Sequence, residues 1–346
     1  MLIKKADYNF RELIAIPFFL SHSEVFQMKK VNIGGQAVLE GVMMKGPESY
    51  ALAVRTPEKN IDVQVTQYKS VGERHKLANI PIVRGVINFI ESLYIGIGTL
   101  MKSSEYYDDE EEESEKKNEK KSEKSEKSKE AADKAYMIGT LIISLVIAIG
   151  VFMLIPVFLA SFMKKFTESE FVVNLTEGVL RLLLFLGYVA LISLMKDIKR
   201  TFMYHGAEHK TINCLEAGDD LTVENVKKHT RFHKRCGTSF VFIVMFISII
   251  VFMFVKTDVL WLKMISRLVL IPFIAGIAYE FIRYAGRHEN AFSNILSMPG
   301  LWVQRLTTRE PDDDMIEVAI ASVDAVIDWH EYVDCVRNDS FEDSKK

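Results

Sequence analysis

The chain has 346 residues, 43 basic and 46 acidic side chains, a formal net charge of -3, and a hydrophobic content of 49%. Its charge is unevenly distributed: 21 of the 30 residues from Glu105 to Lys134 are charged, whereas long stretches elsewhere carry no charge. These uncharged stretches exclude a purely water-soluble protein. Three cysteines in a chain of this length exclude a disulfide-stabilised scaffold.

The N-terminal part predicts a leader and then a small β-rich unit. Residues 1–30 are expected to be an unstructured leader, and Met28 could be the physiological start. In the following unit, 31–102, alternating segments at 50–56 and 61–68 flank a turn-forming Pro57-Glu-Lys-Asn60, which predicts a hairpin. The preceding segment, GGQAVLEGVMMKGP, lacks the spacing of a phosphate-binding loop, so bulged strands and tight turns are expected there.

A helix and a charged segment follow the β-rich part. The helix, expected at 82–101, should lie in the membrane interface or against a helical bundle; a fifth membrane span here would move the β-rich unit to the other side of the membrane. Residues 103–136 predict a charged, disordered tether, helical in places, because they have too few apolar side chains to build a core.

Residues 137–284 predict a four-helix transmembrane bundle. Its spans are expected at 137–163, 171–195, 239–255 and 264–282. The second span contains Glu177 and Arg181, and the fourth contains Arg267 and Glu280. Because charged side chains in a bilayer need polar partners, we expect these two helices to face the bundle interior.

The distribution of basic residues predicts the orientation of the spans. The loop 196–238 has nine lysines and arginines, whereas each connection on the other side has two. We therefore expect this histidine-rich loop, both termini and the β-rich unit to be cytoplasmic, with all three cysteines on the reducing side. The C-terminal segment 285–346 should include a helix at 312–330, whose apolar stripe is Ile316, Ile320, Val323 and Ile327. The expected fold class is thus mainly α, a four-helix transmembrane bundle with a small β-rich cytoplasmic unit.

An HxxEH motif in the cytoplasmic loop predicts a metal site. On a helix, His205 and His209 share one face and could hold a divalent ion such as Zn²⁺, with Glu208 beside them as a general base.

Two further groups could supply more ligands. His229, His233 and Cys236 are spaced to share a helical face, and Glu289 follows the fourth span. The surrounding KKHTRFHKR is equally typical of a basic juxtamembrane segment that contacts anionic headgroups. The predicted metal ligands are His205, His209, His229, His233, Cys236 and Glu289.

Several segments together resemble the YqhQ family of bacterial multi-pass membrane proteins, which is built around a domain of unknown function. They are GGQAVLEGVMMKGP, PIVRG, YHGAEHKTINCLEAG, HTRFHKRCGTSF and the stretch from Arg287 to Pro299. The resemblance extends from Met28 to about Ala321. It implies a bacterial cell-membrane location and supports a metal, since members are commonly described as predicted metal-dependent enzymes, but it implies no established reaction.

Two classes of function fit these observations. The first is a metal-dependent hydrolase at the cytoplasmic membrane face that acts on an anionic or membrane-borne substrate, since basic residues around the motif would attract phosphate or carboxylate groups. The alternative is a non-enzymatic membrane scaffold or membrane-protein assembly factor. A transporter would need oligomerisation, because four spans are few. Expected partners are the lipid bilayer, anionic lipids and other membrane proteins, with no nucleic acid. The sequence leaves the substrate and the oligomeric state open.

Overall fold

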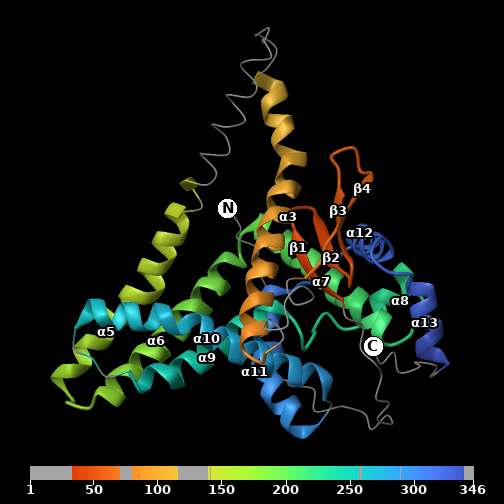
Figure 1. Ribbon diagram of the computed structural model, residues 1–346. Coiled ribbons are helices and arrows are strands. Elements are labelled where there is room, and N and C mark those ends of the chain that lie inside the picture. Colours follow the sequence, from red (N-terminus) through yellow and green to blue (C-terminus); the bar gives the residue numbers. More distant parts are fainter. Residues whose placement is uncertain are drawn as a thin grey trace, which may run out of the picture.

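The computed structural model describes residues 33–70, 80–115 and 139–338, except 141, 256, 258 and 289. This part of the chain is mainly helical, with one four-stranded antiparallel sheet near its N-terminal end (Figure 1). The predicted leader 1–30 and the tether from residue 116 to 136 lie outside the described residues.

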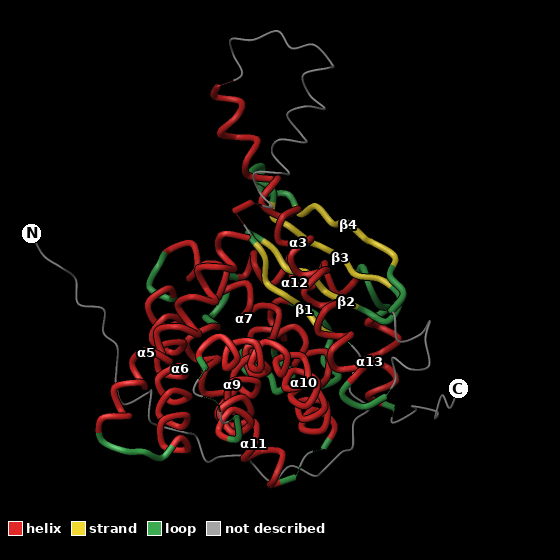
Figure 2. Tube along the Cα trace, turned by 60° about the vertical axis from the view of Figure 1, so that its left-hand side comes forward, coloured by secondary structure: helices red, strands yellow, loops and turns green. Residues whose placement is uncertain are grey.

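The sheet is a meander in the order β1-β2-β3-β4 (Figure 2). Its strands are β1 (Gly34–Val38), β2 (Gly41–Lys45), β3 (Ser49–Arg55) and β4 (Ile61–Gln67). The predicted hairpin is the β3–β4 pair, and the amide of Thr56 donates to the carbonyl of Asn60 across its turn. The glycine-rich segment forms the β1–β2 hairpin, where Glu40 has a φ of 49°. The β3–β4 hairpin and the tight turn of the glycine-rich segment are therefore confirmed, but the expected bulges are absent from these strands, whose residues pair in continuous register.

Both faces of the sheet are covered by helices. Because side chains alternate along a strand, Val42 and Met44 face one core, which α7 (Lys196–Glu216) and α12 (Asp313–Asp324) complete. Met43 faces the opposite core, which contains Ile95 of α3 (Val83–Glu115). Burial on both sides explains why β2 is a run of apolar residues rather than an alternating strand.

Helix α3 is longer than the predicted helix 82–101 and continues into the predicted tether as far as Glu115. Two tyrosines stabilise this extension: the Tyr106 hydroxyl donates to the Asp62 carboxylate, and the Tyr107 hydroxyl donates to the carbonyl of Arg55. In Figure 1, α3 stands upright across the apolar helices. It packs against α10 (Leu260–Arg287), where the Arg84 guanidinium pairs with the Glu280 carboxylate.

Three helices are long and apolar enough to cross a membrane: Ile142–Lys165, Glu170–Ile192 and Trp261–Gly286. The first contains a π-helical turn (Gly150–Leu154), α5 (Ile155–Ser161) and a 3₁₀ turn (Phe162–Lys165). The second is α6, and the third lies within α10. The remaining predicted span is α9 (Gly237–Met253), which is apolar but has only 17 residues.

Three further helices pack against those already described: α8 (Val223–Lys228) and α13 (Trp329–Arg337) against α7, and α11 (Ala291–Thr307) against α9 and α10. The sequence pattern predicts one helix at 312–330, but the structure has two, because the helix breaks after Asp324 and Asp328 caps α13 by accepting from the amide of Glu331. The predicted stripe is confirmed on α12, where Ile316 and Val323 are fully buried and Ile320 is partly buried, whereas Ile327 lies beyond the end of the helix. The sheet, α12 and α13 gather at one end of α6, α9 and α10 (Figure 1).

Candidate metal centre

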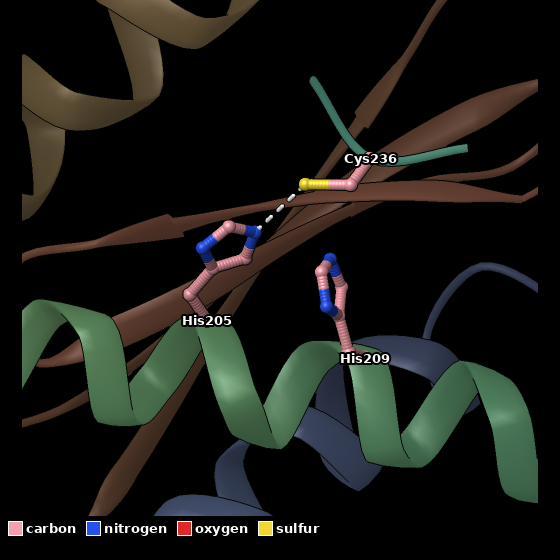
Figure 3. Close-up of side chains that lie close together, drawn as sticks. All are labelled: His205, His209 and Cys236. Carbon is pink, nitrogen blue, oxygen red and sulfur yellow. Dashed lines mark hydrogen bonds between the residues drawn. The ribbon is translucent and has the colours of Figure 1, made fainter. Parts of the chain in front are cut away.

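Helix α7 carries the HxxEH motif to the junction between the sheet and the apolar helices. His205 and His209 rise from the same face of α7, with their ring centroids 4.4 Å apart (Figure 3). Cys236, the N-cap residue of α9, approaches them from a loop, and its Sγ lies 3.3 Å from Nε2 of His205. One ligand atom from each of the three lies within 4.8 Å of the others. Two imidazoles and a thiol at this spacing could hold a metal ion.

Two backbone carbonyls fix the orientation of both imidazoles. Nδ1 of His205 lies 2.8 Å from the carbonyl oxygen of Thr307, and Nδ1 of His209 lies 2.6 Å from that of Arg231. A carbonyl oxygen can only accept a hydrogen bond, so Nδ1 carries the proton in each ring. When its ring is neutral, each imidazole therefore keeps its lone pair on Nε2, which is the usual preparation of a histidine ligand.

Cys236 and His205 form a coupled acid–base pair. Burial acts to raise the pKa of the Cys236 thiol, but His205 and His209 beside it bring that pKa well below its ordinary value. Burial also acts to lower the pKa of His205, but the Cys236 thiolate outweighs this effect and raises it to about 9. The lowered pKa favours the thiolate of Cys236, the form in which cysteine binds metals.

Glu208 is buried beside the two histidines. Its Oε2 lies 4.0 Å from Nε2 of His205 and has no hydrogen-bond partner within the described part of the chain. Strand β1 lies directly against Glu208. A side chain at Gly35 would not fit, because an added Cβ atom would lie only 2.7 Å from the Glu208 side chain. Burial raises the pKa of Glu208. A carboxylate with a raised pKa and one unpartnered oxygen is suited to accept a proton.

The predicted helical face across 229–236 is wrong. Helix α8 ends at Lys228, and the chain from there to Cys236 is irregular. His233 is buried near His209, but its Nε2 lies 3.5 Å from Oε2 of Glu216, and the Gln304 side chain binds the backbone N–H and C=O of His233. Burial lowers the pKa of His233. His233 therefore packs beside His209 at the edge of the centre but is not one of the three grouped ligand residues.

His229 belongs to a different cluster. Its Nε2 lies 2.9 Å from Oδ2 of Asp219, and these two with Cys214 form a second group whose ligand atoms lie within 4.8 Å of one another. Burial, together with Asp219 and Asp220, raises the pKa of Cys214 to about 12. This thiol is therefore protonated at neutral pH, which makes the second group the weaker candidate. Glu289 lies outside the described residues.

Acidic residues neutralise several of the basic side chains near the centre. Glu310 pairs with Lys210 at 2.9 Å and with Arg231 at 2.8 Å, and Asp313 pairs with Lys227 at 2.7 Å. These pairs reduce the positive charge that the sequence pattern suggested would attract anionic molecules.

Some residues of the centre carry no signal in the sequence. The carbonyls of Thr307 and Arg231 are backbone groups, which every residue has, so no pattern could indicate them. Gln304 belongs to a helix that the sequence analysis did not predict. Gly35 had a signal, the dense glycines of 34–47, for which close approach of another surface is one of the two usual reasons.

A protein family described as "Protein of unknown function (DUF1385)" matches residues 80–329 of this chain. The chain belongs to the DUF1385 family. It is 38% identical over 295 residues to the "Uncharacterized protein YqhQ" of Bacillus subtilis (strain 168), which covers 85% of this chain and 92% of that protein. The predicted resemblance to YqhQ is therefore confirmed. No solved structure matches the chain. The descriptions of DUF1385 and its relative name neither a metal nor a reaction.

Proposed function

We propose that this DUF1385 protein spans the bacterial cell membrane four times and places the histidine-rich centre at the cytoplasmic face. Three helices have the required length, and α9 would be a fourth span at about 26 Å. The segment 196–238 between α6 and α9 has nine basic residues, whereas the connection before α6 has only Lys164 and Lys165. The positive-inside rule then supports a cytoplasmic position for α7, the sheet and both termini.

We propose further that His205, His209 and Cys236 bind one divalent cation, for which Zn²⁺ is the best match. The observation that carries this proposal is the convergence of the three ligand atoms with both Nδ1 atoms held by carbonyls. Three protein ligands of nitrogen and sulfur are typical of catalytic zinc sites. Glu208, with an unpartnered oxygen beside His205, supports a hydrolytic role over a structural one.

When bound, the ion would supply a Lewis acid that polarises a carbonyl or phosphoryl oxygen of the substrate. The chain's own residues would do the rest. Glu208 would take a proton from the attacking water and deliver it to the leaving group, for which its raised pKa is suited. The Thr307 and Arg231 carbonyls would hold His205 and His209 in place.

The position of the centre favours a membrane-borne substrate. Cys236 caps the first turn of α9, and Thr307 is the last residue of α11. Helix α9 therefore begins at the centre, and helix α11 ends there. Near this end of α11, Trp302 is 42% exposed, about 8 Å along the helix from Thr307. Apolar side chains beside helix ends are typical of the membrane interface, where a lipid-linked substrate could reach the centre without leaving the bilayer.

The proposal is tested by the metal content of the full chain purified in mild detergent. We expect about one equivalent of zinc in the wild type and less than a tenth of that in a His205→Ala/His209→Ala variant. Lys199→Ala, at an exposed position of the same helix, is the matched control and should keep the metal. A metal-free, folded wild type would refute the metal centre and favour the assembly-factor alternative. A Glu208→Gln variant that keeps the metal but fails to complement a deletion strain would support chemistry at this centre.

A further inference from the structure

A second polar cluster lies inside the bundle, far from the metal centre. Glu177 of α6 is 1% exposed and contacts three cations: Arg181 on its own helix and Lys263 and Arg267 on α10. Glu177 lies about 10 Å along α6 from its first residue and about 22 Å from its last. The last residue leads into α7 and the metal centre, so this cluster belongs to the opposite half of the bundle.

The cluster has more positive than negative charge. The Arg267 guanidinium binds both carboxylate oxygens of Glu177, while Arg181 contacts Oε1 at 2.7 Å and Lys263 contacts Oε2 at 3.3 Å. Within the described part of the chain, no other carboxylate pairs with these three cations, so one negative charge faces three positive charges. A buried charge is costly in a bilayer unless it is paired. Two positive charges therefore lack a counter-ion among the residues that the structure describes.

The donors of the cluster are oriented and not all satisfied. Both guanidinium groups lie over the ring of Phe252, 5.4 Å for Arg181 and 5.1 Å for Arg267, which leaves their N–H edges for polar partners. Arg267 is 1% exposed, and its Nε has no hydrogen-bond partner among the described residues. Asn174 holds Lys263 from the other side at 2.7 Å.

We propose that Arg181, Lys263 and Arg267 form a binding site for a phosphate group within the membrane-spanning bundle. Guanidinium groups bind phosphate oxygens through paired N–H groups, and basic pockets between transmembrane helices bind lipid headgroups. The side chains of Arg181 and Lys263 are 11% and 10% exposed, so they form the accessible edge of the site. Leu268, beside Arg267 in sequence, is 57% exposed, which places the site next to the lipid-facing surface.

The test measures phosphate binding by the full chain in detergent. Lys263→Met removes one uncompensated cation and leaves Glu177 with two arginines; Lys164→Met removes a lysine that pairs with Glu170 at the same end of α6 and is the matched control. We expect tightly bound phosphorus to co-purify with the wild type and with Lys164→Met, and to fall about tenfold or more in Lys263→Met. If Lys263→Met does not fold, Arg181→Met serves the same purpose.

Two additions distinguish the sources of the phosphate group. After delipidation, thermal unfolding is followed with inorganic phosphate and in nanodiscs of phosphatidylglycerol or phosphatidylcholine. A midpoint raised by phosphatidylglycerol alone supports a lipid headgroup, and one raised by inorganic phosphate supports a free anion. Equal phosphorus in all variants, with no shift from either addition, would overturn the site and show a purely structural ion network. The His205→Ala/His209→Ala variant should keep its phosphorus, so failure of the metal proposal remains separable.

Discussion

At Cys236, burial and charge act in opposite directions on the thiol, and charge prevails. Two histidines within the same cluster stabilise the thiolate, and the thiolate in turn keeps a proton on His205. A proton would therefore compete with the proposed metal ion for the same group of atoms. The identity of a single side chain, a cysteine rather than a serine at the cap of α9, decides this electrostatic state.

The affinity for zinc should consequently depend on pH. Because the pKa of His205 is raised to about 9, its proton must be displaced by the metal at neutral pH, and the apparent affinity should rise up to about tenfold per unit from pH 7 to 9. Competition with a chromophoric chelator measures this profile. Cys236→Ser removes the thiolate that raises the pKa of His205, so burial should bring that pKa below about 9 and the profile should level off at a lower pH than in the wild type, at lower overall affinity. A wild-type profile that is flat from pH 7 to 9 would contradict the coupling.

At the scale of elements, the metal centre depends on the packing of strand β1 against helix α7. Glu208 is covered by the backbone of Gly35, and the turn after β1 is held to α7 by Glu40, which pairs with Arg200 and accepts from the hydroxyl of Tyr204. The β-rich unit therefore forms one wall of the centre. The two neighbouring glycines of β1 differ in what lies near them, which allows a controlled test.

Gly35→Ala should destabilise the protein by about 1–3 kcal/mol, since the new Cβ would overlap the Glu208 side chain. Gly34→Ala is the control: a Cβ there has no atom within 4 Å, so the change in stability should stay within about 0.5 kcal/mol. Chemical denaturation of both variants in detergent measures the difference. Equal stabilities would mean that β1 does not lie against Glu208.

For the whole molecule, the arrangement of charges and apolar helices favours the proposed orientation in the membrane. The sheet, α7, α12 and α13 lie at the end of the bundle that carries most of the basic residues, while the connection between Lys165 and Glu170 lies at the other end.

This orientation predicts a pattern of cysteine labelling in intact cells. In a Cys335→Ser background, Glu168→Cys should react with a membrane-impermeant maleimide, because Glu168 is exposed in the connection before α6. Asp324→Cys, exposed at the end of α12, should react only after permeabilisation. The reverse pattern would invert the topology and place the metal centre outside the cell.

Much of this protein could be inferred from local features of its sequence. The length of an apolar stretch decides whether a helix can reach across a bilayer, and spacing by four residues alone places His205 and His209 on one face of α7. The hairpin at β3 and β4 follows equally from alternation and a turn-forming cluster. These properties need only neighbouring residues, and for that reason a single chain read in order is enough to predict them.

Other features depended on contacts between distant segments. That Cys236 completes the cluster while His229 joins Asp219, that Gly35 covers Glu208, and that three cations surround Glu177 all follow from how β1, α6, α7, α9 and α10 pack together. Spacing along an assumed helix misplaced His229 and His233 because the chain between α8 and α9 is irregular. Side chains far apart in sequence meet only when the packing of whole elements brings them together, and that information lies in the tertiary structure.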